Sequence, residues 1–77
     1  MEENMRDVEI REEPVELFKI LKFESMVNSG GQAKMVIADG LVKVNGTVET
    51  RKRKKIVNGD IIEFAEEKVR IVFPGKK

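Results

Sequence analysis

The sequence predicts a single small domain of the α+β class, because two helical patterns are followed by a succession of short strand patterns. A chain of 77 residues is long enough for one hydrophobic core, and an apolar fraction of 40% supplies it. We expect one domain over residues 1–77, with a core from about residue 14 to residue 73. Residues 74–77 are expected to form a flexible tail.

The N-terminal part predicts one strand and one helix. Polar and apolar residues alternate over residues 7–10, which is typical of a short strand with Val8 and Ile10 facing inward. Pro14 suits the first position of a helix, since proline lacks the amide hydrogen that would be unpaired there. A broad apolar arc follows, so we expect a helix over residues 14–23.

A second helix is predicted to begin after Ser29. Ser29 and Gln32 have the spacing of a capping box, in which each side chain accepts a hydrogen bond from a backbone N–H near the helix start. Gly40 follows the last periodic position, where a left-handed conformation is easiest for glycine. The buried stripe is formed by residues at i, i+3 and i+4: Ala33, Val36 and Ile37.

Two glycines, Gly30 and Gly31, occupy the first turn of this predicted helix. Glycine is a poor helix former, so a flexible loop before the helix is one interpretation. The other is that the absence of side chains lets a phosphate approach the free N–H groups of the helix start. The residues alone leave both interpretations open.

The clearest local signal is a hairpin over residues 42–48. Its Asn45-Gly46 pair supplies the two positive φ angles that a type I′ turn requires. Val42 and Val44 are expected to point inward, and Lys43 outward toward solvent or a ligand. Further strands are predicted over residues 61–64 and 68–73.

Five consecutive cations follow the hairpin, and we name residues 51–55 the basic run. In an extended chain both faces of this run are cationic, and unpaired charge is costly to bury, so it must lie at an edge or in a loop. It either protects a sheet edge as a solvated segment or contacts a polyanion. The members of the basic run are Arg51, Lys52, Arg53, Lys54 and Lys55.

Charge is distributed unevenly along the chain, although the net charge is only +1. Residues 1–24 carry eight acidic and four basic side chains, whereas residues 25–58 carry seven basic and two acidic ones. A bipolar small domain can attract a polyanion at one end without being basic overall.

Several functions are not expected from the composition. The chain has neither Cys nor His, which removes thiolate metal sites, disulfides and the commonest metal ligand. Ser25 and Ser29 therefore lack a histidine base, and neither an enzyme nor a cofactor site is expected. Without a long apolar run or an apolar N-terminus, we expect a cytoplasmic protein with no membrane span and no signal peptide.

The order of the motifs resembles the S-four-type RNA-binding domain, or αL motif, and is most similar to its small free-standing bacterial members of the YbcJ type. The resemblance covers about two-thirds of the chain. It implies two antiparallel helices packed on a small bent antiparallel sheet, with short N- and C-terminal strands added. It also implies that RNA binds along a groove beside the second helix and the hairpin. The matching stretches are residues 29–34, 37–40, 42–46, 48–55 and 58–64.

The resemblance also nominates RNA-binding residues. Lys34, Lys43 and Asn45 match family positions on the binding face, and the basic run matches that of the free-standing members. The wider family often has Arg where this chain has Gly30, so the arginine's phosphate contact cannot be transferred, and backbone N–H groups would have to replace it. The complete predicted set is Ser29, Gly30, Gly31, Gln32, Lys34, Lys43, Asn45, Arg51, Lys52, Arg53, Lys54 and Lys55.

The predicted function is therefore recognition of structured RNA, ribosomal or transfer RNA, through phosphates and shape, by a monomer without a small-molecule substrate. Stacking of bases on aromatic rings is not expected, because Tyr and Trp are absent and the four Phe are mostly assigned to the core. The alternative is a ribosome-associated protein-interaction adaptor that uses the acidic N-terminal part. A sulfur-carrier role is not expected, because the chain ends in Pro74-Gly75-Lys76-Lys77 and not in Gly-Gly.

Overall fold

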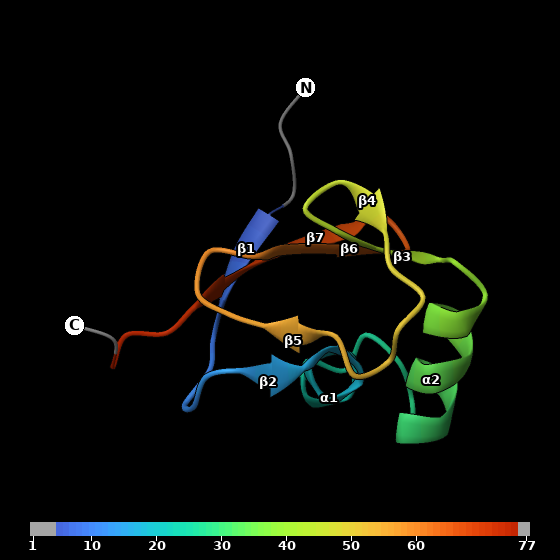
Figure 1. Ribbon diagram of the computed structural model, residues 1–77, viewed down its shortest axis with the longest axis horizontal. Coiled ribbons are helices and arrows are strands. Elements are labelled where there is room, and N and C mark those ends of the chain that lie inside the picture. Colours follow the sequence, from blue (N-terminus) through green and yellow to red (C-terminus); the bar gives the residue numbers. More distant parts are fainter. Residues whose placement is uncertain (1–4, 76–77) are drawn as a thin grey trace.

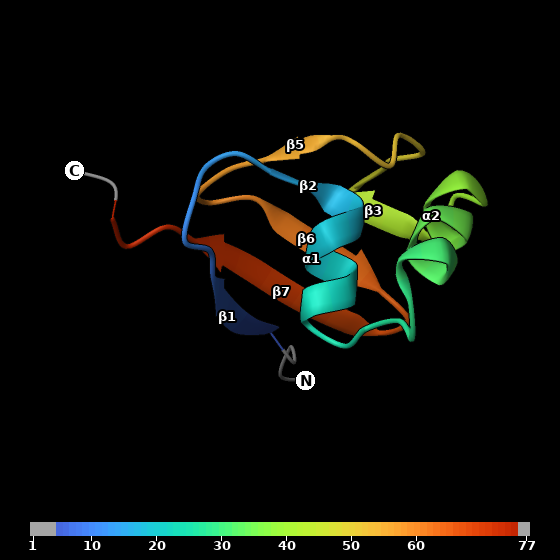
Figure 2. The same cartoon turned by 90° about the horizontal axis from the view of Figure 1, so that it is seen from below.

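The computed structural model describes residues 5–75 as a five-stranded sheet, two short helices and a separate two-stranded ribbon (Figure 1). Viewed from the helix side, α1 lies across one face of the sheet and α2 stands at the end near β3 (Figure 2). Residues 76–77 of the predicted tail lie outside the described part of the chain. In chain order the elements are β1 (Met5–Glu9), β2 (Val15–Glu16), α1 (Leu17–Phe23), α2 (Gly30–Ala38), β3 (Val42–Val44), β4 (Thr47–Val48), β5 (Lys55–Ile56), β6 (Ile61–Phe64) and β7 (Glu67–Val72).

The predicted α+β class is confirmed, and the sheet is mixed. Its strand order is β1-β7-β6-β3-β4, and every pair is antiparallel except β1 with β7. The parallel pair places Val8 opposite Ile71, with almost the whole domain serving as the connection between the two strands. The predicted strand near residues 7–10 therefore exists, and it adds a parallel edge to an antiparallel sheet.

The first helix begins three residues later than the sequence predicts. Pro14 lies before β2 and is not the first residue of a helix, because Val15 and Glu16 pair with Ile56 and Lys55 in a two-stranded ribbon. This long-range pairing draws the segment into an extended conformation, and the helix starts only where the pairing ends, at Leu17.

The second helix has the predicted ends. Ser29 is its N-cap, and Gly40, with a φ of +79°, ends it. The N–H groups of Gly40 and Leu41 donate to the carbonyls of Ile37 and Val36 at 3.0 and 3.1 Å, which is the Schellman arrangement.

The two helices pack against each other but do not run antiparallel. Figure 1 looks along the axis of α1 while α2 lies across the view, and Figure 2 reverses this, so the helices cross. The link between them turns sharply at Ser25, whose φ is +59°, and the N–H of Met26 donates to the carbonyl of Leu21 at 3.0 Å.

The predicted hairpin turn is confirmed. Asn45 and Gly46 have φ angles of +54° and +84°, as a type I′ turn requires. A second two-residue turn joins β6 to β7 at Ala65 and Glu66, both of which also have positive φ.

The core lies between the helices and the inner face of the sheet. It takes apolar residues from every layer, and Leu17, Leu21, Ile37, Ile56 and Ile62 have no exposed surface. Burial of this kind is the main stabilising contribution in a domain of this size. Among residues 5–75, neither α1 nor α2 has the length and apolar character that crossing a membrane requires.

Candidate nucleic-acid interface

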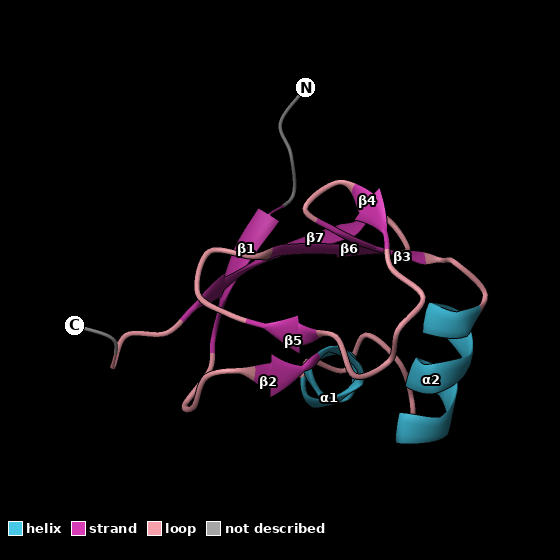
Figure 3. Cartoon of the chain, in the orientation of Figure 1, coloured by secondary structure: helices cyan, strands magenta, loops and turns pink. Residues whose placement is uncertain are grey.

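The basic run occupies the loop that leads from β4 to β5 (Figure 3), and its last residue, Lys55, begins β5, so the run lies at an edge of the fold as its charge pattern predicts. Its chain reverses in a turn, in which the N–H of Lys54 donates to the carbonyl of Arg51 at 3.2 Å. The side chains of Arg51, Lys52, Arg53 and Lys55 are exposed.

The backbone of the basic run is fixed to the start of α1. The N–H groups of Leu17 and Phe18 donate to the carbonyls of Lys54 and Lys52 at 2.9 and 3.1 Å. The amides of a first helical turn have no partner within the helix, and the N-cap, Glu16, makes no side-chain hydrogen bond to them. The carbonyls of the basic run therefore cap α1, and this capping uses none of its side chains.

The basic run and α2 enclose one open hollow of about 620 Å³, which we name the cationic groove. Lys34 from α2 thus joins the cations of the loop, although it lies far from them in the sequence. The groove is lined by Lys34, Ala38, Thr50, Arg51, Lys52, Arg53, Lys54 and Lys55.

Two carboxylates hold the arginines of the groove. Glu49 accepts from Nε and Nη2 of Arg51 at 2.9 and 3.3 Å, and from the backbone N–H of Arg51 at 3.0 Å. The side-chain and backbone hydrogen bonds from Arg51 keep the pKa of Glu49 below its ordinary value of 4.5, and the side-chain bond raises the pKa of Arg51. Arg53 lies 3.4 Å from Glu16, which Lys19 also approaches at 3.8 Å.

The remaining cations of the groove are not held in ion pairs by any described carboxylate. Within residues 5–75, Lys52, Lys54 and Lys55 form no ion pair, although Lys54 lies close enough to Glu49 to help lower its pKa and Lys55 is the register partner of Glu16. The ammonium of Lys34 lies 5.1 Å above the ring of Phe18, a contact that orients the charge without cancelling it.

Ser29 and Gln32 are occupied in capping α2. The hydroxyl of Ser29 accepts from the N–H of Gln32 at 3.1 Å, and the Oε1 of Gln32 accepts from the N–H of Asn28 at 2.7 Å, one residue before the usual capping-box donor. Gly30 and Gly31 leave the helix start uncovered, and a Cβ built on Gly30 would lie 3.8 Å from the Cδ of Lys22. These four residues do not line the cationic groove.

Lys43 and Asn45 are also outside the groove. Lys43 is exposed on what we name the outer sheet face, formed by Asp7, Lys43, Glu63, Lys68 and Arg70 on the side opposite the core. Asn45 donates through Nδ2 to Asp60 at 3.1 Å and accepts through Oδ1 from the N–H of Ile61 at 2.9 Å. The Asn45 side chain therefore fixes the hairpin to the next strand.

The partner carboxylates were absent from the predicted site. Glu49 and Arg51 are two residues apart in an extended segment, a spacing that places both on one side, so this pair has a sequence signal. The pairing of Glu16 with Arg53 depends on the β2–β5 ribbon and has no local signal. Over the described residues, no group of three or more acidic side chains could hold a metal ion.

Comparison with known proteins assigns this chain to a family. The family model described as the S4 domain matches residues 8–72. YbcJ of Escherichia coli (strain K12) is 55% identical over 58 residues, which span 75% of this chain and 83% of YbcJ. In Bacillus subtilis (strain 168), the protein named "Probable ribosome maturation protein RlbA" is 32% identical over 57 residues, or 74% of this chain and 80% of that protein.

Two solved structures resemble the fold. The solution structure of E. coli YbcJ, described as revealing an αL motif involved in RNA-binding, matches with a TM-score of 0.64 at 44% identity, covering 94% of this chain and 90% of that one. The 30S ribosomal protein S4e from Thermoplasma acidophilum matches with a TM-score of 0.65 at 28% identity, covering 78% of this chain and 32% of that one. The chain therefore belongs to the S4 domain family.

Proposed function

We propose that this protein binds structured RNA, ribosomal or transfer RNA, by contacting phosphates and reading the shape of the backbone. One observation carries the proposal. The cationic groove collects six basic side chains from α2 and the basic run, and within residues 5–75 four of them form no ion pair with a carboxylate. A concentrated, exposed positive surface on a chain of net charge +1 fits a polyanion.

The relatives support RNA as that polyanion. The αL motif of YbcJ is described as involved in RNA-binding, and the name of RlbA refers to ribosome maturation. The S4 domain is an RNA-binding family and not an enzyme family. We extend this to a monomer that acts in the cytoplasm without a cofactor, a metal or a small-molecule substrate.

The predicted residues divide into three groups in this proposal. The cations of the groove contact phosphates directly. Gly30 and Gly31 offer backbone N–H groups at the start of α2, which Ser29 and Gln32 hold in shape. Lys43 and Asn45 contribute at most at the margin, because Lys43 lies on the outer sheet face and Asn45 is bonded within the fold.

The salt dependence of RNA affinity tests the proposal. If about five cations engage a single strand, the logarithm of the association constant falls with the logarithm of salt concentration at a slope of roughly −3 to −4. A slope near zero, measured with transfer RNA or a ribosomal RNA fragment, would exclude phosphate neutralisation. Sequencing of RNA crosslinked to the protein in its host identifies the target.

The alternative function, a ribosome-associated adaptor without direct RNA contact, makes a different prediction. Its capture by ribosomal proteins would withstand nuclease treatment, whereas RNA-mediated capture would be lost. Retention after nuclease, together with a flat salt profile, would favour the adaptor.

A further inference from the structure

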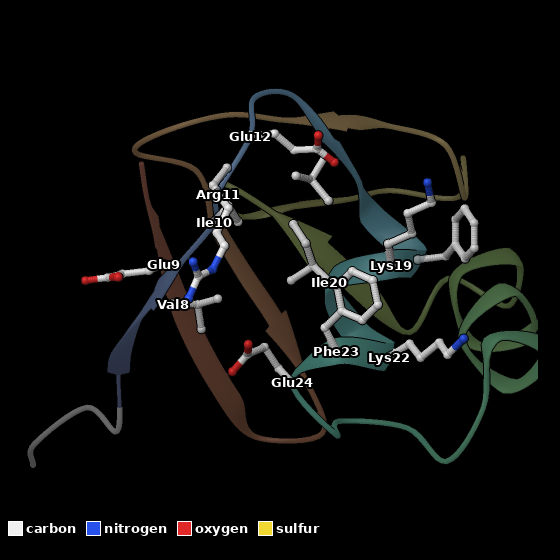
Figure 4. A pocket seen from close by; sticks show the side chains of 12 residues that line it. Val8, Glu9, Ile10, Arg11, Glu12, Lys19, Ile20, Lys22, Phe23 and Glu24 are labelled. Atoms are coloured by element: carbon white, nitrogen blue, oxygen red, sulfur yellow. The ribbon is translucent and has the colours of Figure 1, made fainter. Parts of the chain in front are cut away.

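A second hollow, of about 450 Å³, lies between α1 and the segment that runs from β1 toward β2 (Figure 4). Its apolar lining includes Val8, Ile10, Ile20 and Phe23. Phe23 is 67% exposed, which is unusual for an aromatic side chain in so small a domain. The other three phenylalanines pack against the core: Phe18, Phe64 and Phe73.

This hollow adjoins the cationic groove at two points. Phe18 lines the hollow, and the ammonium of Lys34, which lines the groove, sits over its ring at 5.1 Å. Lys19 also lines the hollow, and it shares the carboxylate of Glu16 with Arg53 of the groove. The groove and the hollow are therefore neighbours, separated by the ring of Phe18 and the carboxylate of Glu16.

Charges of both signs stand around the hollow. Figure 4 shows Lys19 and Lys22 on the α1 side and Glu9 on the β1 side. The carboxylate of Glu24 is paired with Arg6 at 3.0 Å. Lys19 and Lys22 thus attract phosphates to the α1 rim, whereas the opposite rim is mixed, because Arg11 stands beside Glu9 and Glu12. A nucleotide whose phosphate is held at the α1 rim would bind with its base over the apolar lining.

We propose that the hollow around Phe23 is a subsite for one unpaired nucleobase of the RNA whose phosphates lie in the cationic groove. The inference rests on the proposed function and adds base contact to phosphate recognition. Every base has a π-face, so stacking on Phe23 is tolerant of sequence and selects an unpaired nucleotide next to the backbone contacts. Such a nucleotide is found in loops and bulges and not inside a regular duplex.

Two polyanionic probes distinguish contact with a base from contact with phosphates. Short oligoadenylate carries bases, whereas inorganic polyphosphate carries charge alone. We expect Phe23→Ala to lower the affinity for oligoadenylate by roughly 5- to 100-fold, the loss typical of one stacked base, and to leave the affinity for polyphosphate unchanged. Phe23→Trp should restore oligoadenylate binding. Leu41→Ala is the matched control, because Leu41 is an apolar side chain with 56% exposure that does not line the hollow.

The chain contains no tryptophan, so Phe23→Trp also introduces a unique fluorophore. Its emission should change on addition of oligoadenylate and not of polyphosphate. Unchanged oligoadenylate affinity in Phe23→Ala, or an equal loss for both probes, would overturn the base subsite alone. Wild-type protein that binds neither probe would overturn the RNA-binding function as well. If Phe23→Ala changes only self-association in sedimentation, the hollow belongs to a second copy and the proposal fails.

Discussion

The cationic groove and the outer sheet face are built from the same kinds of side chain, but their charges are arranged differently. On the outer sheet face each cation has an acidic neighbour on the adjoining strand: Arg70 lies 3.0 Å from Asp7, Lys68 lies 3.9 Å from Glu63, and Lys43 is the register partner of Glu63. In the groove, Lys52, Lys54 and Lys55 form no ion pair within residues 5–75, and two carboxylates serve all six cations: Glu49 and Glu16, the register partner of Lys55.

This contrast shows why net charge is a poor guide to the function of this chain. Cross-strand pairing confines the field of the outer sheet face to short range, whereas the groove keeps a net positive field, because two carboxylates face six cations. Binding is expected to follow the unpaired cations and not the total number of lysines and arginines.

The largest effect is expected when three cations are removed from the cationic groove, and a second variant removes three from the outer sheet face. Lys52, Lys54 and Lys55, the loop cations that form no ion pair within residues 5–75, changed together to Ala should lower RNA affinity by about 50-fold near physiological salt and reduce the salt slope by about 2, because three phosphate contacts are lost. Fluorescence anisotropy with labelled transfer RNA measures both quantities.

The matched variant changes Lys43, Lys68 and Arg70 to Ala, which alters the net charge equally. Its affinity should stay within about fivefold of wild type, since no phosphate contact is removed. Equal losses in the two triple variants would mean that overall charge, and not the groove, governs binding.

A substitution at Asn45 tests whether the RNA-binding surface extends to the hairpin turn. Asn45→Ala removes a side chain that holds Asp60 and the N–H of Ile61 and that tolerates positive φ, so the free energy of unfolding should fall by about 1–2 kcal/mol. RNA affinity should change by less than about twofold, because the groove is elsewhere. Urea unfolding and anisotropy provide the two measurements, with the exposed neighbour Thr47→Ala as the control. A large loss of RNA affinity without a loss of stability would mean that Asn45 does contact RNA.

Adding a cation tests whether the start of α2 belongs with the groove. Gly30→Arg should raise RNA affinity about fourfold by one added phosphate contact. The substitution is sterically allowed, since the nearest atom to a built Cβ, the Cδ of Lys22, is at 3.8 Å. Gly30→Ala separates charge from helix propensity: it should stabilise the helix by up to about 1 kcal/mol without changing affinity. If the arginine variant binds RNA no better than the alanine variant, phosphates do not reach this helix end.

The smallest expected effect concerns the Glu49–Arg51 pair, one of the two ion pairs that hold arginines of the groove. Because the folded-state pKa of Glu49 is lowered, ionised Glu49 stabilises the fold above its ordinary pKa of 4.5, and this contribution is lost as the pH falls through the lowered value. Glu49→Gln should therefore lower the Tm slightly at pH 7 and make no difference at the acidic end. Thermal unfolding across this range measures it, with the exposed Glu12→Gln as the control. A Tm difference that grows on acidification would contradict this account.

Local signals in the sequence predicted much of the fold. The Asn45-Gly46 turn, the Ser29 cap and the Gly40 helix end each depend on residues within one turn of the chain, and all three are confirmed. The predicted start of α1 was wrong, because Val15 pairs with Ile56, and a partner so distant in the sequence leaves no local pattern.

The site was predictable only in part for the same reason. The consecutive cations of the basic run are visible in the sequence, and the structure places Lys34 on the same groove. The neutralising partners and the separate position of Lys43 depend on strand register. The exposure of Phe23 follows from its place off the buried stripe of Leu17, Ile20 and Leu21, a signal that a helical projection contains.

The attachment of the basic run to α1 separates the shape of this loop from its chemistry. Its two anchoring bonds are accepted by the backbone carbonyls of Lys52 and Lys54, and every amino acid has such a carbonyl. The side chains of this segment can therefore change, by evolution or by design, while the path of its backbone stays the same. The same backbone path can then carry different side chains, so that one small scaffold can recognise different nucleic acids.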